Sequence, residues 1–379
     1  MDEKKKVPKL RFPGFTDDWE QRKLGDILKY EQPGEYIVDS TNYDDSYNTP
    51  VLTAGQTFIL GYTNETTGIK NASENNPVII FDDFTTSSHF VDFSFKIKSS
   101  AMKLLTLIDD MDDIYCINNI LENIDYVPVS HERHWISIFS KFDVIVPKDK
   151  DEQKKIGDYF RKLDHLITLH QRKLQHIKDF KKAMLQKMFP KKGEKYPEIR
   201  FPEFTDAWEQ RKFGDVGSVA MCKRIFKGQT SDKGEVPFYK IGTFGGKPDA
   251  FISRELFNEY KTKYPYPNKG DILISASGSI GRTVEFTGKD EYFQDSNIVW
   301  LKHESEIDNN FLKVLYSVVE WSCEGSTIKR LYNDNFLKTE FMLPQIDEQI
   351  KLGTFFASLD NLITLHQREF IISNYKNIF

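Results

Sequence analysis

The chain has 379 residues, of which 39% are hydrophobic and 14% aromatic. This composition supplies packed cores and excludes a chain that is disordered throughout. The formal net charge of −5 disfavours nonspecific binding of nucleic acid by the whole chain, so any such contact must come from local patches or from a partner. No apolar run is long enough to cross a membrane, and residues 1–6 lack the apolar stretch of a signal peptide. We therefore expect a cytoplasmic protein without membrane contact.

The first recognisable element is a lead-in segment that occurs twice. Residues 8–26 return at residues 197–215 with fourteen of nineteen positions unchanged. Proline and glycine predict an extended start, and the apolar spacing from Trp19 to Leu28 predicts a short amphipathic helix. Trp19 and its counterpart Trp208 are predicted to be core residues.

Each lead-in is followed by a centre, and the two centres do not resemble each other. The first centre covers about residues 30–145 and the second about 217–342. Short runs of β-branched and aromatic residues between glycine and asparagine are typical of strands. Residues 311–321 predict a helix, so we expect an α+β domain in each half. The expected strands include residues 57–60, 77–81 and 90–97, and residues 237–241, 271–275 and 297–301.

A long helix is predicted after each centre. Asp-Glu-Gln follows a proline at residues 151–153 and again at 347–349, and acidic residues suit the first turn of a helix because of its dipole. Residues 163–172 return at 359–368 with nine of ten positions identical. The first helix would extend to Phe189, a length of about 58 Å.

The two helices carry apolar residues in alternating steps of four and three, which is a heptad pattern. Neither stripe is stable alone, so we expect the helices to pair as a coiled coil that holds the two globular units apart. The pairing is antiparallel if the units are related by a pseudo-twofold axis. The copies diverge after Arg368, so we expect the last turns to be shortened or altered. The predicted seam contains Leu163, Ile167, His170, Leu174, Ile177, Met184, Met188, Leu359, Ile363 and His366.

The duplication divides the chain into two globular domains, residues 1–150 and 191–345, and two helical segments, residues 151–190 and 346–379. Charge is distributed unevenly among them. Residues 1–150 carry 16 basic and 25 acidic groups, whereas residues 151–195 carry 13 basic and 6 acidic groups. The basic run from Lys181 to Lys195 is interpreted either as a solvated helix face or as a surface that faces phosphates.

The sequence contains no recognisable catalytic constellation and no metal site. Asp82 and Asp83 follow an apolar strand, as in metal-dependent nucleases, but Ser94 stands where an acidic residue is required two positions before Lys96. The glycines of Gly278–Arg282 predict a tight turn between strands, because a complete phosphate-loop motif is missing.

Other polar clusters also have ordinary explanations. His131 and His134 lack the spacing of two metal ligands on one helical face, and the acidic residues from Asp109 to Asp113 predict a solvated loop. The three cysteines are odd in number and far apart, so the sequence suggests neither a zinc site nor a disulfide framework and predicts ordinary buried thiols. They are Cys116, Cys222 and Cys323.

Several residues have the chemistry to contact nucleic acid. Hydroxyl and imidazole groups between two strands of the first centre can meet phosphates or base edges, as can a basic cluster and a polar loop in the second centre. For each residue alone, a solvated surface is the more common role. The candidates are Thr85, Thr86, Ser87, Ser88, His89, Lys223, Arg224, Lys227, Ser277, Ser279 and Arg282.

The repeated motifs resemble those of the specificity subunits of Type I restriction–modification systems. The matching motifs are P-x-[LI]-R-F-x-x-F-x-x-x-W at Pro8 and Pro197, D-E-Q-x-x-[IL]-G at Asp151 and Asp347, and L-D-x-L-I-T-L-H-Q-R at Leu163 and Leu359. The segment Gly270–Ser275 with Gly278–Arg282 is also similar to the target-recognition domains of this family.

The resemblance implies that each centre is a target-recognition domain that reads one half of a bipartite site in double-stranded DNA, with the helices setting the gap. It implies two modification subunits that use S-adenosylmethionine, and restriction subunits, joined through them, that use ATP and Mg. This chain would hold no cofactor and perform no catalysis. The alternative is a standalone DNA-binding regulatory or decoy protein without partner subunits.

Overall fold

The computed structural model describes residues 8–53, 57–128, 134–325 and 329–373, with residues 369–373 described by their backbone alone. His131 and the end of the divergent C-terminal segment, residues 374–379, lie outside the described residues. The chain divides into two compact units, the first up to Gln171 together with the chain from Glu369 on, and the second from Arg172 to Arg368. No helix within the described ranges combines the length and apolarity needed to cross a lipid bilayer.

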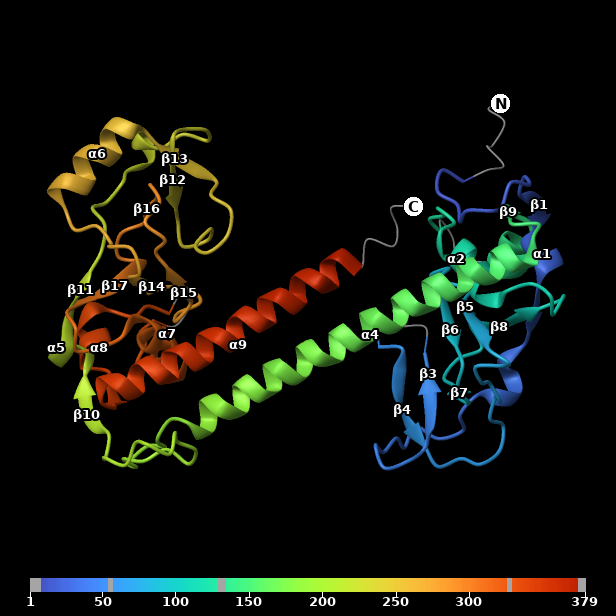
Figure 1. Cartoon of the computed structure of the whole chain (residues 1–379), viewed down its shortest axis with the longest axis horizontal. Helices are drawn as coiled ribbons and strands as arrows, with labels where there is room; N and C mark the ends of the chain where they lie inside the picture. The colour runs from blue at the N-terminus through green and yellow to red at the C-terminus, as the bar shows by residue number, and fades with distance from the viewer. Residues whose placement is uncertain (1–7, 54–56, 129–133, 326–328, 374–379) are drawn as a thin grey trace. The chain divides into compact units, whose positions relative to one another are not determined.

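The first unit contains a four-stranded sheet with the order β2-β8-β5-β6, a three-stranded sheet with the order β4-β3-β7, and a separate pair of β1 with β9 (Figure 1). Its elements in chain order are β1 (Glu20–Lys23), α1 (Leu24–Ile27), β2 (Leu28–Glu31), η1 (Pro33–Tyr36), β3 (Thr49–Leu52), β4 (Ile59–Thr63), β5 (Val78–Asp82), β6 (Ser88–Val91), β7 (Lys96–Ile97), β8 (Met102–Leu107), α2 (Ile114–Glu122), α3 (His134–Ser137), η2 (Phe139–Lys141), β9 (Asp143–Val146) and the start of α4 (Lys150–Lys187).

The second unit contains sheets with the orders β11-β17-β14-β15 and β13-β12-β16, and a separate pair of β10 with β18. Its elements are β10 (Glu209–Lys212), α5 (Phe213–Val216), β11 (Gly217–Ala220), η3 (Lys227–Gln229), β12 (Val236–Tyr239), β13 (Ala250–Ile252), α6 (Arg254–Lys263), β14 (Ile272–Ser275), β15 (Thr283–Glu285), β16 (Tyr292–Phe293), β17 (Ile298–His303), α7 (Asn309–Val318), α8 (Asn333–Lys338), β18 (Glu340–Leu343) and α9 (Ile346–Ser373).

The two units share one topology although their centres differ in sequence. In the small sheets, β3 pairs antiparallel with β4 and parallel with β7, and β12 pairs in the same way with β13 and β16. All neighbouring strands in the four-stranded sheets are antiparallel. Strands β5 and β14 are buried along their whole length, which explains why their sequences are continuous apolar runs. The α+β class and the duplication are therefore confirmed.

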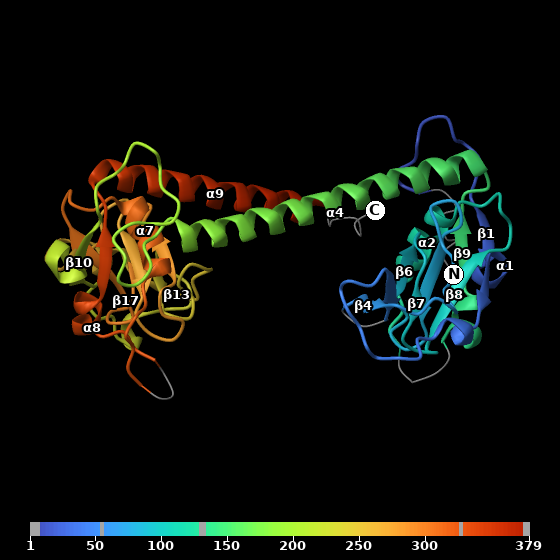
Figure 2. The same ribbon diagram turned by 90° about the horizontal axis from the view of Figure 1, so that it is seen from below.

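Each four-stranded sheet packs against one helix of its own unit. Ile117 and Leu121 of α2 belong to the same buried cluster as Phe81 of β5, and Phe311 and Leu315 of α7 contribute to the cluster that contains β14. The predicted helix at residues 311–321 is thus present, between Asn309 and Val318. Figure 2 shows α7 beside the sheet of the second unit.

The long helices pair within the second unit. The C-terminal part of α4 and the N-terminal part of α9 lie side by side in both views (Figures 1 and 2). The rings of Phe189 and Phe356 have centroids 6.2 Å apart, and Lys181 forms an ion pair with Asp360. Residue numbers therefore fall along α4 as they rise along α9, and the antiparallel pairing is confirmed.

The predicted seam residues all lie on less exposed positions of these helices. On α4 they are half-buried, and Met188, just past the end of α4, is buried. On α9 Leu359 and His366 are buried and Ile363 is half-buried. Within the second unit, Ile177 and Met184 pack against the buried cluster that contains Leu359. The heptad spacing thus identifies the buried faces of both helices.

The predicted helix from Trp19 to Leu28 is wrong. Residues 20–23 form β1, which pairs antiparallel with β9, and only Leu24–Ile27 make a helical turn before β2 begins. Leu24 and Ile27 are both fully buried. The error arises because the partner of β1 lies more than a hundred residues later in the chain, where local spacing cannot reveal it.

Two further predictions need correction. The single strand expected at residues 90–97 is two strands, since β6 pairs with β5 and β7 with β3 in the other sheet, and residues 92–94 between them are exposed. The acidic segment is only partly solvated. The Asp112 carboxylate is buried and bound to Arg22, Lys150 and Gln153, and Asp113 caps α2 by accepting a hydrogen bond from the Cys116 amide.

Candidate nucleic-acid interface

The loops that carry the predicted DNA contacts occupy equivalent places in the two units. Residues 83–87 connect β5 to β6, and residues 276–282 connect β14 to β15. Each hairpin forms the same edge of its four-stranded sheet. The sequences of these loops are unrelated, so only the topology reveals that the two sets of candidates correspond.

In the first unit, the loop hydroxyls are largely engaged with their own loop. Thr85 Oγ1 donates to Asp82 Oδ2 over 2.6 Å and lies 2.7 Å from Ser87 Oγ. Thr86 has a φ of 60°, a left-handed conformation that is unusual for a side chain with a branched Cβ. The Ser88 hydroxyl is buried and has no hydrogen-bond partner among the residues that the structure describes.

His89 differs from a simple surface histidine. Its ring lies against the ring of Phe58, with centroids 4.4 Å apart. Burial lowers the pKa of His89, although the nearby carboxylate of Asp82 opposes the shift. A neutral imidazole at neutral pH can hydrogen-bond a base edge but adds no positive charge to attract phosphates.

In the second unit, the predicted tight turn is present and is closed by hydrogen bonds of Ser275. Ser275 Oγ accepts a hydrogen bond from the Arg282 amide over 2.9 Å and donates to the Ser279 carbonyl over 2.6 Å. Gly278 and Gly281 have φ values of 66° and 89°, which glycine adopts without strain. Ser279 and Arg282 remain exposed at the end of this turn.

A four-residue connector, Gln294–Asn297, holds three loops of the second unit together. Gln294 Oε1 accepts the Ile241 amide over 2.9 Å, Asp295 Oδ2 accepts Arg224 Nε over 2.8 Å, and Asn297 Oδ1 accepts the Ser277 hydroxyl over 2.7 Å. The three loops follow β11, β12 and β14. The connector therefore joins, through hydrogen bonds, three loops that are distant in sequence.

The basic side chains of these loops make different contacts. Arg282 Nη2 donates to the Ile241 carbonyl over 2.8 Å, and its guanidinium lies 5.4 Å from the centroid of Phe244. Lys223 Nζ lies 5.0 Å from the ring centroid of Tyr264. A shallow pocket of about 300 Å³ lies beside them, lined by Met221, Cys222, Lys223, Arg224, Tyr264, Pro265 and Asp295.

Among the predicted contact residues, the structure thus brings Arg224, Ser277 and Arg282 into one network through the connector. Lys223 precedes Arg224 in the chain and lines the same pocket. Ser277 is buried and its hydroxyl has an internal partner, so its side chain supports the loop. Lys227 begins η3 and is exposed. DNA contact by any of these residues stays a prediction.

The repeated lead-in and the long helices are joined by salt bridges that the sequence reasoning missed. Arg11 pairs with Glu152 over 2.6 and 2.8 Å, and Arg200 pairs with Glu348 over 2.8 Å at both contacts. Trp208 Nε1 also donates to Glu348. Both pairs join an arginine of the first repeated motif to the glutamate of Asp-Glu-Gln. The recurrence of these two opposite charges in both repeats is the sequence signal that could have predicted the salt bridges.

The glutamine of the Asp-Glu-Gln motif contacts the N-cap residue of α2 in the first unit and of α7 in the second. The side chains of Gln153 and Gln349 accept the backbone amides of Asp113 and Asp308 over 3.0 Å each. A Cβ atom on Gly353 would lie 2.7 Å from the backbone nitrogen of Phe311. The glycine of the motif is therefore required by close packing between helices.

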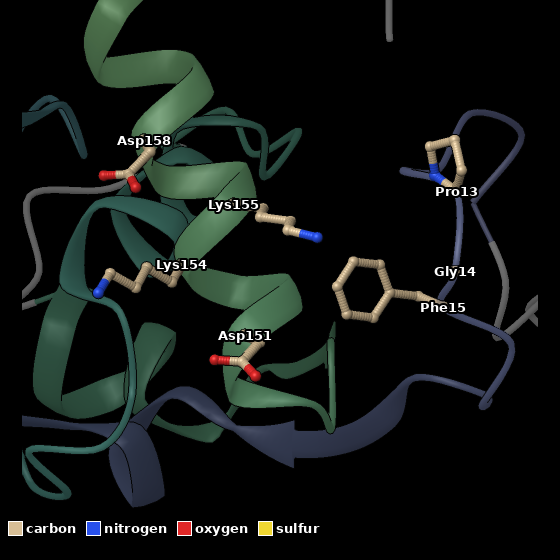
Figure 3. A pocket seen from close by; sticks show the side chains of 7 residues that line it. All are labelled: Pro13, Gly14, Phe15, Asp151, Lys154, Lys155 and Asp158. Atoms are coloured by element: carbon tan, nitrogen blue, oxygen red, sulfur yellow. The ribbon is translucent and has the colours of Figure 1, made fainter.

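A shallow depression of about 500 Å³ lies where the first lead-in meets α4 (Figure 3). Lys155 points toward Phe15, with Nζ 4.7 Å from the ring centroid, while Asp151, Lys154 and Asp158 line the helix side. The second unit repeats this arrangement with Lys351, which lies 5.5 Å and 5.7 Å from the ring centroids of Phe201 and Phe204. Both units thus present an aromatic and cationic surface at the same repeated motifs.

The described residues provide no group of three or more His, Cys, Asp or Glu side chains suited to a metal ion. Asp83 accepts the Trp135 amide and pairs with Lys103, and all three residues are buried. His134 is a core residue. Cys116 and Cys222 are buried, and burial raises the pKa of Cys222 to about 12, so this thiol is not an activated nucleophile. Cys323 is half-buried.

Comparison with known proteins agrees with this architecture. A family model described as Type I restriction modification DNA specificity domain matches residues 16–179 and 205–371. The type I specificity subunit S.HindORF215P of Haemophilus influenzae is 56% identical over 158 residues, 40% of this chain and 41% of that protein. The EcoR124I/EcoR124II specificity subunit of Escherichia coli is 47% identical over 153 residues, 38% of this chain and 37% of that protein.

These two matches span about two fifths of each relative. Similarity of fold extends further. The crystal structure of the S subunit of a Type I restriction-modification system from M. genitalium superposes with a TM-score of 0.67 at 12% identity, covering 98% of this chain and 96% of that chain. The family model covers the centres of both repeats, together with the second part of each lead-in and most of each long helix. The chain therefore belongs to the family of Type I restriction modification DNA specificity domains.

Proposed function

We propose that the chain is the DNA-recognition subunit of a Type I restriction–modification complex, in which each centre reads one half of a bipartite site. The observation that supports this most is the repeated topology with different side chains at equivalent loops. One scaffold bearing two unrelated loop sets suits two different half-sites, because sequence is read by the side chains that reach base edges.

The partner surfaces of this proposal are the segments that are the same in both repeats. The leucines of the L-I-T-L segments are off the seam and exposed, with Leu166 and Leu169 at 48% and 45%, and Leu362 and Leu365 at 43% and 53%. Exposed apolar residues at matching positions of two repeats are expected where identical partners bind. We assign these leucines, with the surfaces around Phe15 and Phe204, to the docking of two modification subunits.

In this assignment the chain supplies recognition, and its partners supply the chemistry. The modification subunits would use S-adenosylmethionine to methylate adenine, and restriction subunits joined through them would use ATP and Mg. The helices α4 and α9 would set the gap between the half-sites.

Adenine-methylation mapping tests the proposal. DNA from cells that carry this chain and its cognate modification subunit is compared with DNA from cells that carry the modification subunit alone. We expect a bipartite methylated motif that depends on the chain. Exchange of residues 30–145 for another centre should change one half-site and leave the other intact.

Two outcomes would contradict the proposal. A change in both half-sites after this exchange would refute modular reading. Tight sequence-specific binding by the isolated chain, without any chain-dependent methylation, would instead favour the standalone DNA-binding protein.

Replacement of Leu362 and Leu365 by serine should prevent co-purification with the modification subunit, whereas serine at the exposed Ile59, which lies outside the repeated segments, should not.

A further inference from the structure

Arg224 has a geometry that sets it apart from the other cations of the second unit. Its side chain is 59% exposed, yet its Nε is fixed by a 2.8 Å hydrogen bond to Asp295 Oδ2. The Asp295 side chain is only 14% exposed. The guanidinium is therefore held in one plane while its outer edge faces solvent.

The attachment through Nε leaves both terminal nitrogens available. Neither Nη1 nor Nη2 of Arg224 has a hydrogen-bond partner among the described residues of the chain. Two parallel N–H groups in a fixed plane match the O6 and N7 acceptors of guanine in the major groove, the commonest specific contact between protein and DNA. Fixing the plane in advance lowers the entropy that the side chain loses on binding.

The surroundings suit approach to a DNA groove. Lys223 and Lys227 are exposed on the same loop and can contact phosphates. Asp295 belongs to the connector, and the neighbouring Ser296 has a φ of 60° and donates to Asp295 Oδ2 over 3.3 Å. The support of Arg224 is thus part of the hydrogen-bond network that joins three loops.

Two comparisons within the chain single out Arg224. One terminal nitrogen of Arg282 already donates a hydrogen bond to the Ile241 carbonyl, and the guanidinium lies over Phe244. Arg282 therefore does not have both terminal nitrogens available for a base. In the first unit, β2 is followed by Gln32 and by η1, which contain Glu35 but neither arginine nor lysine. The first unit therefore has no counterpart of the supported arginine at this place.

We propose that Arg224, oriented by Asp295, reads one guanine in the half-site recognised by the second unit. Arg224 is the specificity-determining contact, and Asp295 is a positioning residue that acts through it. This inference rests on the proposed function, because it assumes that the second centre faces the major groove of double-stranded DNA.

Methylation mapping with the full complex provides the test in cells. Arg224→Lys keeps the charge and loses the planar fork, so the guanine position should become degenerate, with discrimination reduced roughly 5- to 150-fold. Asp295→Ala should weaken discrimination at the same position. Lys227→Ala is the matched control on the same loop; it should lower methylation evenly across sequences and leave the motif unchanged.

A binding measurement on the purified complex of this chain with modification subunits keeps the proposal testable if Arg224→Lys gives no methylation. Each guanine of the second half-site is replaced in turn by 7-deazaguanine, which lacks the N7 acceptor. The wild-type complex should lose affinity at one guanine, and the Arg224→Lys complex should lose less there, because lysine lacks the planar pair of donors.

A second half-site without guanine, or equal sensitivity of both complexes at every guanine, would overturn the assignment to Arg224 while leaving the recognition role intact. An effect confined to the first half-site would also overturn it. A wild-type chain that directs no methylation would instead overturn the proposed function, and the guanine assignment with it.

Discussion

Replacing Glu348 with alanine should destabilise the start of α9 far more than the loss of a surface charge would. The Glu348 side chain is 1% exposed and Arg200 is 13% exposed, and they share two hydrogen bonds of 2.8 Å. Trp208 Nε1 donates to the same carboxylate over 3.2 Å. The alanine variant leaves a buried guanidinium and an indole N–H without their acceptor.

Removing one partner of a buried ion pair typically costs about 3–5 kcal/mol, because the remaining charge is left without compensation. That range corresponds to a roughly 150- to 5,000-fold increase in local opening. Hydrogen exchange measured by mass spectrometry on peptides that cover residues 197–208 and 344–356 reports this opening without assuming that a two-unit chain unfolds in one step.

Glu340→Ala is the matched control. Glu340 pairs with Lys212 at 3.7 Å, and both side chains are about half exposed. A surface pair of this kind contributes about 0–1 kcal/mol, so exchange in the same peptides should change less than tenfold. Equal effects of the two substitutions, or protection at residues 344–356 that is unchanged in Glu348→Ala, would refute the argument that burial makes this pair important.

Three further predictions follow from the same contacts. Gly353→Ala places a Cβ 2.7 Å from the Phe311 nitrogen and should lower the melting temperature by an amount that reflects about 1–3 kcal/mol, whereas Gly228→Ala, with no atom within 4 Å, should not. Burial raises the pKa of Asp112, but hydrogen bonds from Lys150, Gln153 and Arg22 outweigh it and lower the pKa. A carboxyl whose pKa is lowered in the folded state stabilises the fold at pH values above its ordinary pKa of about 4. This stability is lost as the pH falls through the folded-state pKa. The difference in stability between wild type and Asp112→Asn, measured by thermal unfolding, should therefore disappear below about pH 4. Insertion of one heptad after Gln175, with a matched insertion in α9, should lengthen the run of base pairs between the two halves of the methylated motif. An unchanged spacing would refute the spacer role.

The sequence reveals the repeats, the antiparallel helices and most buried strands, because these depend on periodicity and on local runs of apolar residues. The heptad spacing correctly selects faces that contain Ile177 and Leu359. The runs around Val78 and Ile272 are strands because both faces of these segments are buried. Such signals need no knowledge of distant partners.

The features that were not predicted depend on contacts between distant residues. The strand at Glu20–Lys23 exists because it pairs with Asp143–Val146, and the acidic group of Asp112 is buried because Arg22 and Lys150 reach it. The support of Arg224 by Asp295 joins residues 71 positions apart. Spacing alone places Arg224 in a basic cluster but cannot show that one edge of its guanidinium is already occupied.

The strand pairs β1–β9 and β10–β18 bring the two ends of each centre together. The chain enters through one strand and leaves through its neighbour, with Glu20 opposite Val146 and Glu209 opposite Leu343. The residues between the paired strands behave as an insertion with fixed ends. The entropic contribution to the free energy of closing such a loop rises by only about 0.6 kcal/mol for each doubling of its length. A centre can therefore be lengthened, shortened or replaced while the helix that follows keeps its starting point. New recognition surfaces can accumulate in evolution without a new frame for each of them.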